Sequence, residues 1–293
     1  MQTLQALAAN EMAESTEIYL FLDGPKNEQD RILSEKTERH FDDIQGFLAK
    51  TKFKRSSNFG LKRNIVAGIN QIMKLHDRAI VLEDDLITSR YFLRFMNSYL
   101  ELYEKNLDVC QISGYSYLEK YFKTFEKPGT YFMRGGDCLA WGTWRRAWDY
   151  YDDDSKSLLS ELQRKKLSKS FDRGGAYPYT EMLNANIKTG RSWAINWYAS
   201  TFLLNKYCLY PVESHALHLS GDEGATNYAP SGPDPLLVRI SGEPVTVEQI
   251  EVKEEKYIMD YYKRFLSQYR PHIITRVFRK ISSVIRNLNA YKL

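Results

Sequence analysis

Short apolar strands alternate with helices over the first 115 residues, and this alternation most strongly limits the folds open to the chain. Strands are predicted at 17–22, 78–82 and 108–113, and helices at 2–13, 28–50, 58–75 and from residue 89 onward. Strands joined through helices run parallel and are covered on both faces by those helices. The pattern therefore predicts an α/β fold with a mostly parallel, Rossmann-like sheet flanked by helices.

Composition and charge narrow the class of protein. With 43% hydrophobic residues, the chain can bury a sizeable core. Its uncharged stretches are shorter than the roughly 18 residues of a membrane span. The N-terminus lacks the features of a secretory signal, and the three cysteines form no C-x-x-C pair. We therefore expect a cytoplasmic protein with reduced thiols.

The net charge of +4 comes from the C-terminus, because residues 270–293 include six basic residues and no acidic ones. The body of the chain has no basic groove with interleaved aromatic residues, so we expect no nucleic-acid partner. After residue 115 the pattern loosens into aromatic loops and short helices. The sequence PSGPDP (230–235) marks a turn-rich boundary, so we expect one domain at 1–228 and a C-terminal helical extension at 229–293.

Three carboxylates follow the strand predicted at 78–82. Glu83, Asp84 and Asp85 repel one another unless a cation or basic groups offset their charge. They could instead cap the next helix, although Thr88 and Ser89 are better placed to do so. Since ligands of open α/β sheets bind at the carboxyl ends of strands, the cluster indicates a divalent ion that also binds a diphosphate.

Two further segments are candidates for binding the same ligand. Asp23 and Gly24 end the first predicted strand, where a simple turn is the alternative. Gly60 precedes a helix whose first turns carry Lys62, Arg63 and Asn64, and a helix N-terminus favours anions. Alone this second signal is weak, because glycine near a helix start is common.

Together these segments resemble nucleotide-sugar-dependent glycosyltransferases of the GT-A fold, in particular bacterial family-2-like sugar transferases related to N-acetylglucosaminyltransferase I. The resemblance covers about residues 1–228. The matching pieces, in chain order, are LDGPK (22–26), NFGLKRNIVAGI (58–69), VLEDDL (81–86), CLAWGTWRRAW (138–148), RSWAINWYAS (191–200) and LYPVESHALHLSGDEGATN (209–227).

The resemblance implies a transferase that moves a sugar from a nucleotide-diphosphate sugar to a glycan or lipid-linked acceptor, inverting and dependent on Mn²⁺ or Mg²⁺. The implied site residues have four roles. By this resemblance Asp23 and Gly24 contact the nucleoside, and Arg63 and Asn64 lie near the donor phosphates. Glu83 and Asp84 belong to the metal-and-ribose motif, and Asp85 is the direct metal ligand.

The catalytic base is assigned by the same likeness. The aspartate that precedes a tryptophan in the eukaryotic relative is Asn196 here, so Asp222 is the first candidate and Glu181 the second. Either could instead be an ordinary surface or capping carboxylate. Asn227 stands where many relatives have histidine.

His215 and His218 suggest an H-x-x-H metal site, but residues three apart on a strand point to opposite faces. We therefore expect them not to share one ion and to have structural or supporting roles. The tryptophans are expected mainly in the core, with Trp141 the best candidate to stack on an acceptor sugar.

One strand of the family pattern is missing, because the chain opens with a helix where a GT-A sheet has its first strand. We expect either an incomplete start or a truncated relative whose sheet has an unpaired gap.

The basic C-terminal segment has apolar residues at helical spacing, as in a helix that lies on an anionic membrane surface. This predicts peripheral contact with the inner face of the cell membrane; a helix packed on the domain is the alternative. Two other functions remain open: a nucleotidyltransferase, and a non-catalytic membrane-peripheral subunit that kept the fold.

Overall fold

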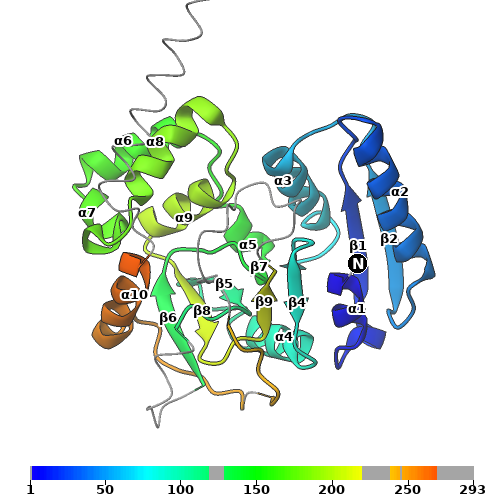
Figure 1. Ribbon diagram of the computed structural model, residues 1–293. Helices are drawn as coiled ribbons and strands as arrows, with labels where there is room; N and C mark the ends of the chain where they lie inside the picture. The colour runs from blue at the N-terminus through cyan, green and yellow to red at the C-terminus, as the bar shows by residue number, and fades with distance from the viewer. Residues whose placement is uncertain (1, 119–128, 220–237, 245, 269–293) are drawn as a thin grey trace, which may run out of the picture.

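The computed structural model describes residues 2–118, 129–219, 238–244 and 246–268 (Figure 1). Its largest sheet has five strands in the order β3–β7–β5–β8–β6. These strands are β3 (Arg78–Val81), β5 (Val109–Ser113), β6 (Thr130–Arg134), β7 (Trp141–Trp144) and β8 (Tyr207–Pro211).

The α/β class is as predicted, but this sheet is mixed and mostly antiparallel. Only β5 and β8 pair in parallel, and the other three pairings are antiparallel. The expectation of a mostly parallel sheet fails here because β6 and β7 come from the irregular second half of the chain. They enter beside strands of the opposite direction, and β7 lies between β3 and β5.

A separate parallel pair is formed by β1 (Glu17–Leu22) and β2 (Ala49–Lys54). The helix predicted at 28–50 is α2 (Glu28–Asp43), which begins at the Asn27 cap and ends well before residue 50. The lysines of β2 point to α2, since Lys52 pairs with Asp42 at 2.7 Å. The predicted helix overlaps β2 only at Ala49 and Lys50, and no strand was predicted over the rest of β2.

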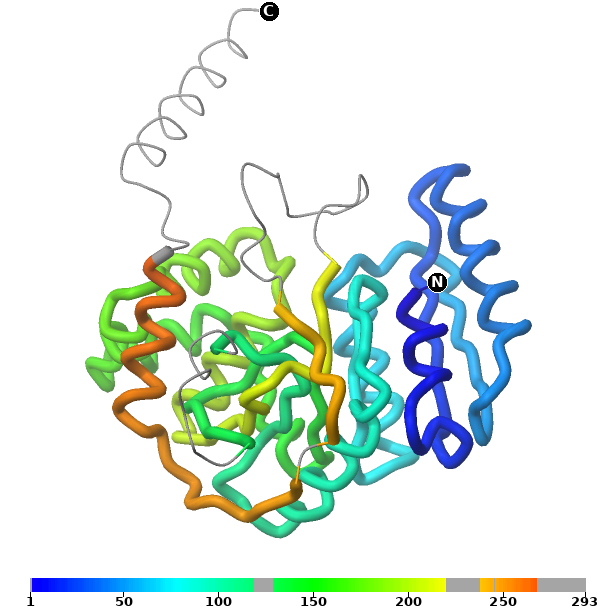
Figure 2. The backbone as a smooth tube through the Cα atoms, turned by 60° about the horizontal axis from the view of Figure 1, so that its bottom comes forward, coloured from blue at the N-terminus to red at the C-terminus, as the bar shows by residue number. Residues whose placement is uncertain are grey.

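No pairing joins β1 to β3 within the described ranges, so each has one free edge. Helix α3 (Leu61–Ile72) lies between the two sheets in both views (Figures 1 and 2). It contacts β1 through Gly68, where a Cβ would lie 3.3 Å from the Phe21 ring, and it also packs on β3. Within the described ranges the β1–β2 pair and the five-stranded sheet are therefore separate, and the two alternatives for the missing strand stay predictions.

A small antiparallel pair links distant parts of the chain. It consists of β4 (Leu86–Thr88) and β9 (Ala216–His218). The opening helix, α1 (Gln2–Ala8), packs on β4 and is shorter than the predicted 2–13. A 3₁₀ turn at Ala13–Ser15 then leads into β1.

The main core contains helix α4 (Phe92–Leu102) and five tryptophans. Trp141 is fully buried, and its ring centroid lies 5.3 Å from that of Trp193 and 5.9 Å from that of Trp197. The expected acceptor-stacking role of Trp141 is wrong for this structure, because neither ring face is open to a sugar.

The remaining helices are α5 (Arg145–Trp148), α6 (Ser155–Arg164), α7 (Ser168–Phe171), α8 (Tyr179–Thr189), α9 (Ala194–Leu203) and α10 (Lys256–Gln268). Helices α6 to α9 form a group on the opposite side of the molecule from β1, whereas α10 packs on β6 and α5 packs on β5 and β7 (Figure 1). Among the residues described, no helix has both the length and the apolarity to cross a membrane. The predicted basic tail helix lies outside the described residues.

Candidate functional site

The acidic segment lies where β3 ends and the chain turns into β4. The Glu83 side chain is half-buried, and burial together with the charges of Asp85 and Asp84 raises the pKa of its carboxyl to about 7. Asp84 is exposed, and its carbonyl accepts a hydrogen bond of 2.7 Å from the Thr3 hydroxyl. The segment therefore concentrates negative charge and is held in place by α1.

His218 lies directly against this segment. The register of β4 and β9 sets His218 opposite Leu86, and the Leu219 amide donates to the Asp85 carbonyl at 2.7 Å. His218 Nε2 is 3.2 Å from Asp85 Oδ2. A side chain from the second half of the chain thus lies beside the carboxylates at the end of β3.

His215 faces elsewhere. It is fully buried, its Nδ1 lies 2.9 Å from the Ser89 hydroxyl, and its ring stacks on Phe95 at 4.8 Å. His215 and His218 therefore have different neighbours, and the prediction that they do not share one ion stays a prediction.

The donor atoms around Asp85 fit the predicted divalent cation as an open site. Within the described part of the chain, no three His, Cys, Asp or Glu side chains are arranged to hold a metal ion. Asp85 and His218 nevertheless offer one oxygen and one nitrogen side by side, with the Asp85 side chain 44% exposed. Such a set suits a cation that takes its other ligands from phosphate oxygens and water.

Asp137 was missed in the sequence analysis. It follows Gly135 and Gly136 in the turn between β6 and β7, and its Oδ1 accepts from the Tyr117 hydroxyl at 2.9 Å. Burial raises its pKa to about 6. The neighbouring Cys138 thiol has its pKa raised by burial and by the charges of Asp137, Glu83 and Asp85, which indicates that this turn lies near the acidic segment.

The glycine pair was the available signal for that turn. Gly135 has φ of +91°, and a Cβ on Gly136 would lie 2.2 Å from Trp197 Nε1. Only glycines allow the chain to pass this close to the tryptophan, and they set Asp137 just beyond it.

Asp23 uses its carboxylate to fix the chain ahead of α3. Oδ1 accepts from the amides of Gly24 and Phe59, and Oδ2 accepts from the Gly60 amide and the Asn58 side chain, at 2.7–3.1 Å. A Cβ on Gly24 would lie 2.2 Å from the Ser57 carbonyl carbon. The predicted nucleoside contact of Asp23 stays a prediction. In this structure the Asp23 carboxylate accepts hydrogen bonds from the backbone amides ahead of α3, which are the amides that would favour an anion.

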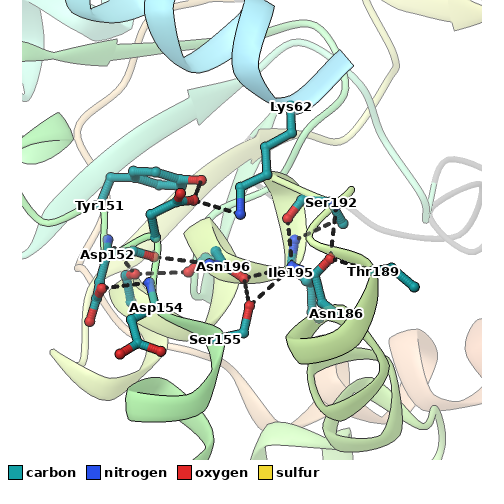
Figure 3. Close-up of polar contacts among 12 residues, drawn as sticks. Lys62, Tyr151, Asp152, Asp154, Ser155, Asn186, Thr189, Ser192, Ile195 and Asn196 are labelled. Atoms are coloured by element: carbon teal, nitrogen blue, oxygen red, sulfur yellow. Dashed lines mark hydrogen bonds and ion pairs between the residues drawn. The ribbon is translucent and has the colours of Figure 1, made fainter. Parts of the chain in front are cut away.

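The predicted phosphate-binding residues lie in the first turn of α3. Arg63 is exposed, with its guanidinium 3.8 Å above the Phe59 ring. Asn64 Oδ1 accepts from Arg55 Nε at 3.0 Å. Lys62 extends from α3 toward the helical group, where its Nζ pairs with Asp153 at 2.7 Å (Figure 3). Arg63 is the member of this group with an exposed cation.

Asn196 is part of a buried polar network (Figure 3). Its Oδ1 accepts from the Ser155 hydroxyl at 2.8 Å and from Asn186 Nδ2 at 3.0 Å, while its Nδ2 donates to the Asp152 carbonyl at 3.1 Å. The network fastens α6, α8 and α9 together. A neutral amide suits this place, because a carboxylate there would be a buried charge.

Of the two candidate catalytic bases, only Glu181 lies in the described part of the chain. Asp222 lies outside the described residues. Glu181 is exposed on α8, which packs on α6, α7 and α9. The structure thus brings together Glu83, Asp85 and His218, and places Glu181 in a different layer.

These features define an α/β protein with an acidic, partly open site at the end of a strand. The chain matches none of the protein-family descriptions with which it was compared, and no curated protein is significantly similar to it.

Proposed function

We propose that the protein is a glycosyltransferase of GT-A type that uses a nucleotide-diphosphate sugar and a divalent cation, Mn²⁺ or Mg²⁺. The observation that carries this proposal is the contact between Asp85 and His218 beside Glu83, at the carboxyl end of β3. This site would hold a cation and leave room for phosphate oxygens. That the diphosphate carries a sugar is inferred from the sequence motifs, which resemble those of GT-A glycosyltransferases and follow the same order along the chain.

In this proposal each residue has one task. Asp85 holds the cation, and Glu83 and Asp84 orient the ribose. Arg63 approaches the donor phosphates from α3. A bound cation would offset the charge of the departing diphosphate. The acceptor hydroxyl loses its proton to a carboxylate as the new glycosidic bond forms, with Asp222 the first candidate for that base and Glu181 the second.

The test is calorimetric titration with UDP and GDP, with and without Mn²⁺ or Mg²⁺. We expect cation-dependent binding in the wild type that Asp85→Asn weakens at least tenfold. Asp77→Asn is the matched control, because Asp77 is an exposed carboxylate (82%) just before the same strand, β3. Binding that needs no cation, or that is equal in all three proteins, would contradict the proposal.

The location of the protein is tested separately. We propose that residues 270–293 hold it at an anionic membrane where a lipid-linked acceptor is found. Deletion of these residues should abolish co-sedimentation with anionic vesicles. Vesicle binding without any nucleotide binding would instead favour the non-catalytic subunit.

A further inference from the structure

The turn that leads into β7 crosses the same edge of the sheet as the acidic segment. Val81, the last residue of β3, pairs with Trp141, the first residue of β7, and Trp141 also pairs with Ser113, the last residue of β5. Asp137 lies four residues before Trp141, and Asp85 lies four residues after Val81. Both carboxylates therefore belong to the edge at which β3 and β5 end.

The Asp137 carboxylate is bound through one oxygen only. Its Oδ1 accepts from the Tyr117 hydroxyl at 2.9 Å and from the Cys138 amide at 2.8 Å. Its Oδ2 is shielded from solvent and has no hydrogen-bond partner within the described ranges. A shielded carboxylate oxygen without a donor is costly, and a hydroxyl that donates to it would remove that cost. Asp137 and Cys138 are half-buried, so the turn itself reaches the protein surface.

The core holds this turn in place. The Asp137 amide donates to Gln111 Oε1 at 3.0 Å, and the same oxygen accepts from Trp197 Nε1 at 2.6 Å. Gln111 is fully buried in the middle of β5. The position of the carboxylate is therefore set by the sheet and α9, which is what proton transfer at a fixed distance requires.

We propose that Asp137 is the catalytic base that takes the proton from the acceptor hydroxyl. As Oδ2 accepts that proton, the acceptor oxygen forms a bond to the anomeric carbon of the sugar. The bond from this carbon to the diphosphate oxygen breaks, and its electron pair leaves with the nucleoside diphosphate. The need for a base rests on the proposed function, whereas its assignment to this turn goes beyond it, since the sequence likeness favours Asp222 or Glu181.

The alternatives within the described part of the chain are less suited to this role. Asn196 is a neutral amide whose oxygen and nitrogen are already bonded within the network of α6, α8 and α9. Glu181 lies on α8, in a different layer from the acidic segment. Burial raises the pKa of Asp137 to about 6, so this carboxylate is a stronger base than an ordinary aspartate and is still mostly ionised at pH 7.

The first test uses water in place of the unknown acceptor. UDP-glucose, UDP-N-acetylglucosamine and GDP-mannose are incubated with the protein and Mn²⁺, and release of UDP or GDP is measured. We expect Asp137→Asn to lower kcat by about a hundredfold or more, with the Kd for the free nucleotide changed less than about threefold. The control is Asp108→Asn, because Asp108 is a 71% exposed carboxylate at the opposite end of β5 and should hydrolyse the donor as the wild type does.

Three results of this test would overturn the assignment. One is wild-type hydrolysis in a folded Asp137→Asn protein, with folding checked by circular dichroism. Another is a larger loss in Asp222→Asn or Glu181→Gln than in Asp137→Asn. The third is a wild type that binds a donor without hydrolysing it, because a base held beside the donor should also activate water.

The second test separates a base from a residue that only shapes the turn. The wild-type rate should rise with pH up to about 6 and then level off, because the base must be ionised. Tyr117→Phe removes a hydrogen bond that stabilises the ionised carboxylate, so this rise should move to higher pH while the rate at high pH changes little. A structural role would lower the rate equally at every pH, and that result would overturn the proposal.

Nucleotide binding distinguishes failure of this inference from failure of the proposed function. If UDP or GDP binds through Asp85 and hydrolysis does not depend on Asp137, the transferase proposal stands and the base is wrong. The base is also wrong if Asp137→Asn weakens cation-dependent binding as strongly as Asp85→Asn does. If neither nucleotide binds, the transferase proposal fails, and the assignment of a base fails with it.

Discussion

His215 shows how one buried side chain can make the stability of the whole chain depend on pH. Its ring is fully buried, shares a hydrogen bond with Ser89 and stacks on Phe95. Burial lowers its pKa from 6.5 to about 4, because the imidazolium would lose its hydration there. The folded protein therefore keeps this histidine neutral where the unfolded chain protonates it.

The sign of the effect follows from that difference. The contribution of His215 to stability is present above about pH 6.5 and is lost as the pH falls toward 4, because the unfolded state binds the additional proton. We expect a loss of roughly 2 to 4 kcal/mol over this range. Urea unfolding between pH 7 and pH 4.5 should show a steeper decline for the wild type than for His215→Gln, and equal slopes would refute the prediction.

At the scale of elements, an ion pair between Glu254 and the buried Arg173 holds the described segment 246–268 against the five-stranded sheet. The Arg173 side chain is 5% exposed, and its Nη1 lies 2.7 Å from Glu254 Oε1, which also accepts from the Arg134 amide at 3.0 Å. A second contact with the same segment comes from Tyr103, whose hydroxyl accepts a hydrogen bond from the Ile250 amide at 3.0 Å. The described segment 246–268 is therefore part of the folded body.

Removing the acidic partner should loosen this segment. Glu254→Gln leaves the Arg173 charge buried without its carboxylate, so we expect the free energy of unfolding to fall by about 3 kcal/mol. Cleavage near residues 246–256 by a protease should become faster. Glu251→Gln is the control, since Glu251 is 73% exposed and pairs with Lys253, and should change stability by less than about 0.5 kcal/mol. Equal effects of the two changes would contradict this role.

The same scale shows what the sequence could predict about the fold and the site. The strands β1, β3 and β5 were placed within one residue, because each is a short apolar run. β2 was missed because three of its six residues are lysines, so its sequence lacks the apolar residues that mark a strand. The directions of β6 and β7 depend on partners distant in the chain, which local patterns do not encode.

The site divides in the same way. Glu83–Asp85 could be predicted from their position after a strand, but whether a cation binds there is untested. The contact of His218 with Asp85 depends on the register of β9 against β4. The place of Asp137 depends on the burial of a turn against Trp197. Neither can be read from spacing along the chain.

For the whole molecule, the split between the sheets predicts two levels of local stability. Every residue of β5 is buried, whereas most residues of β1 and β2 are half-buried or exposed. We expect amides at 17–22 and 49–54 to exchange hydrogen faster than those at 109–113 and 207–211. Exchange followed by mass spectrometry tests this, and uniform protection across both sheets would contradict it.

The split also gives a ligand a mechanical role. In the part of the chain that the structure describes, the β1–β2 pair meets the five-stranded sheet through side-chain packing around α3, without a shared ladder of backbone hydrogen bonds. A donor molecule that contacts both Arg63 on α3 and Asp85 after β3 would connect the β1–β2 pair to the five-stranded sheet. Part of its binding free energy would then appear as stiffening of the β1–β2 pair, far from the atoms that react.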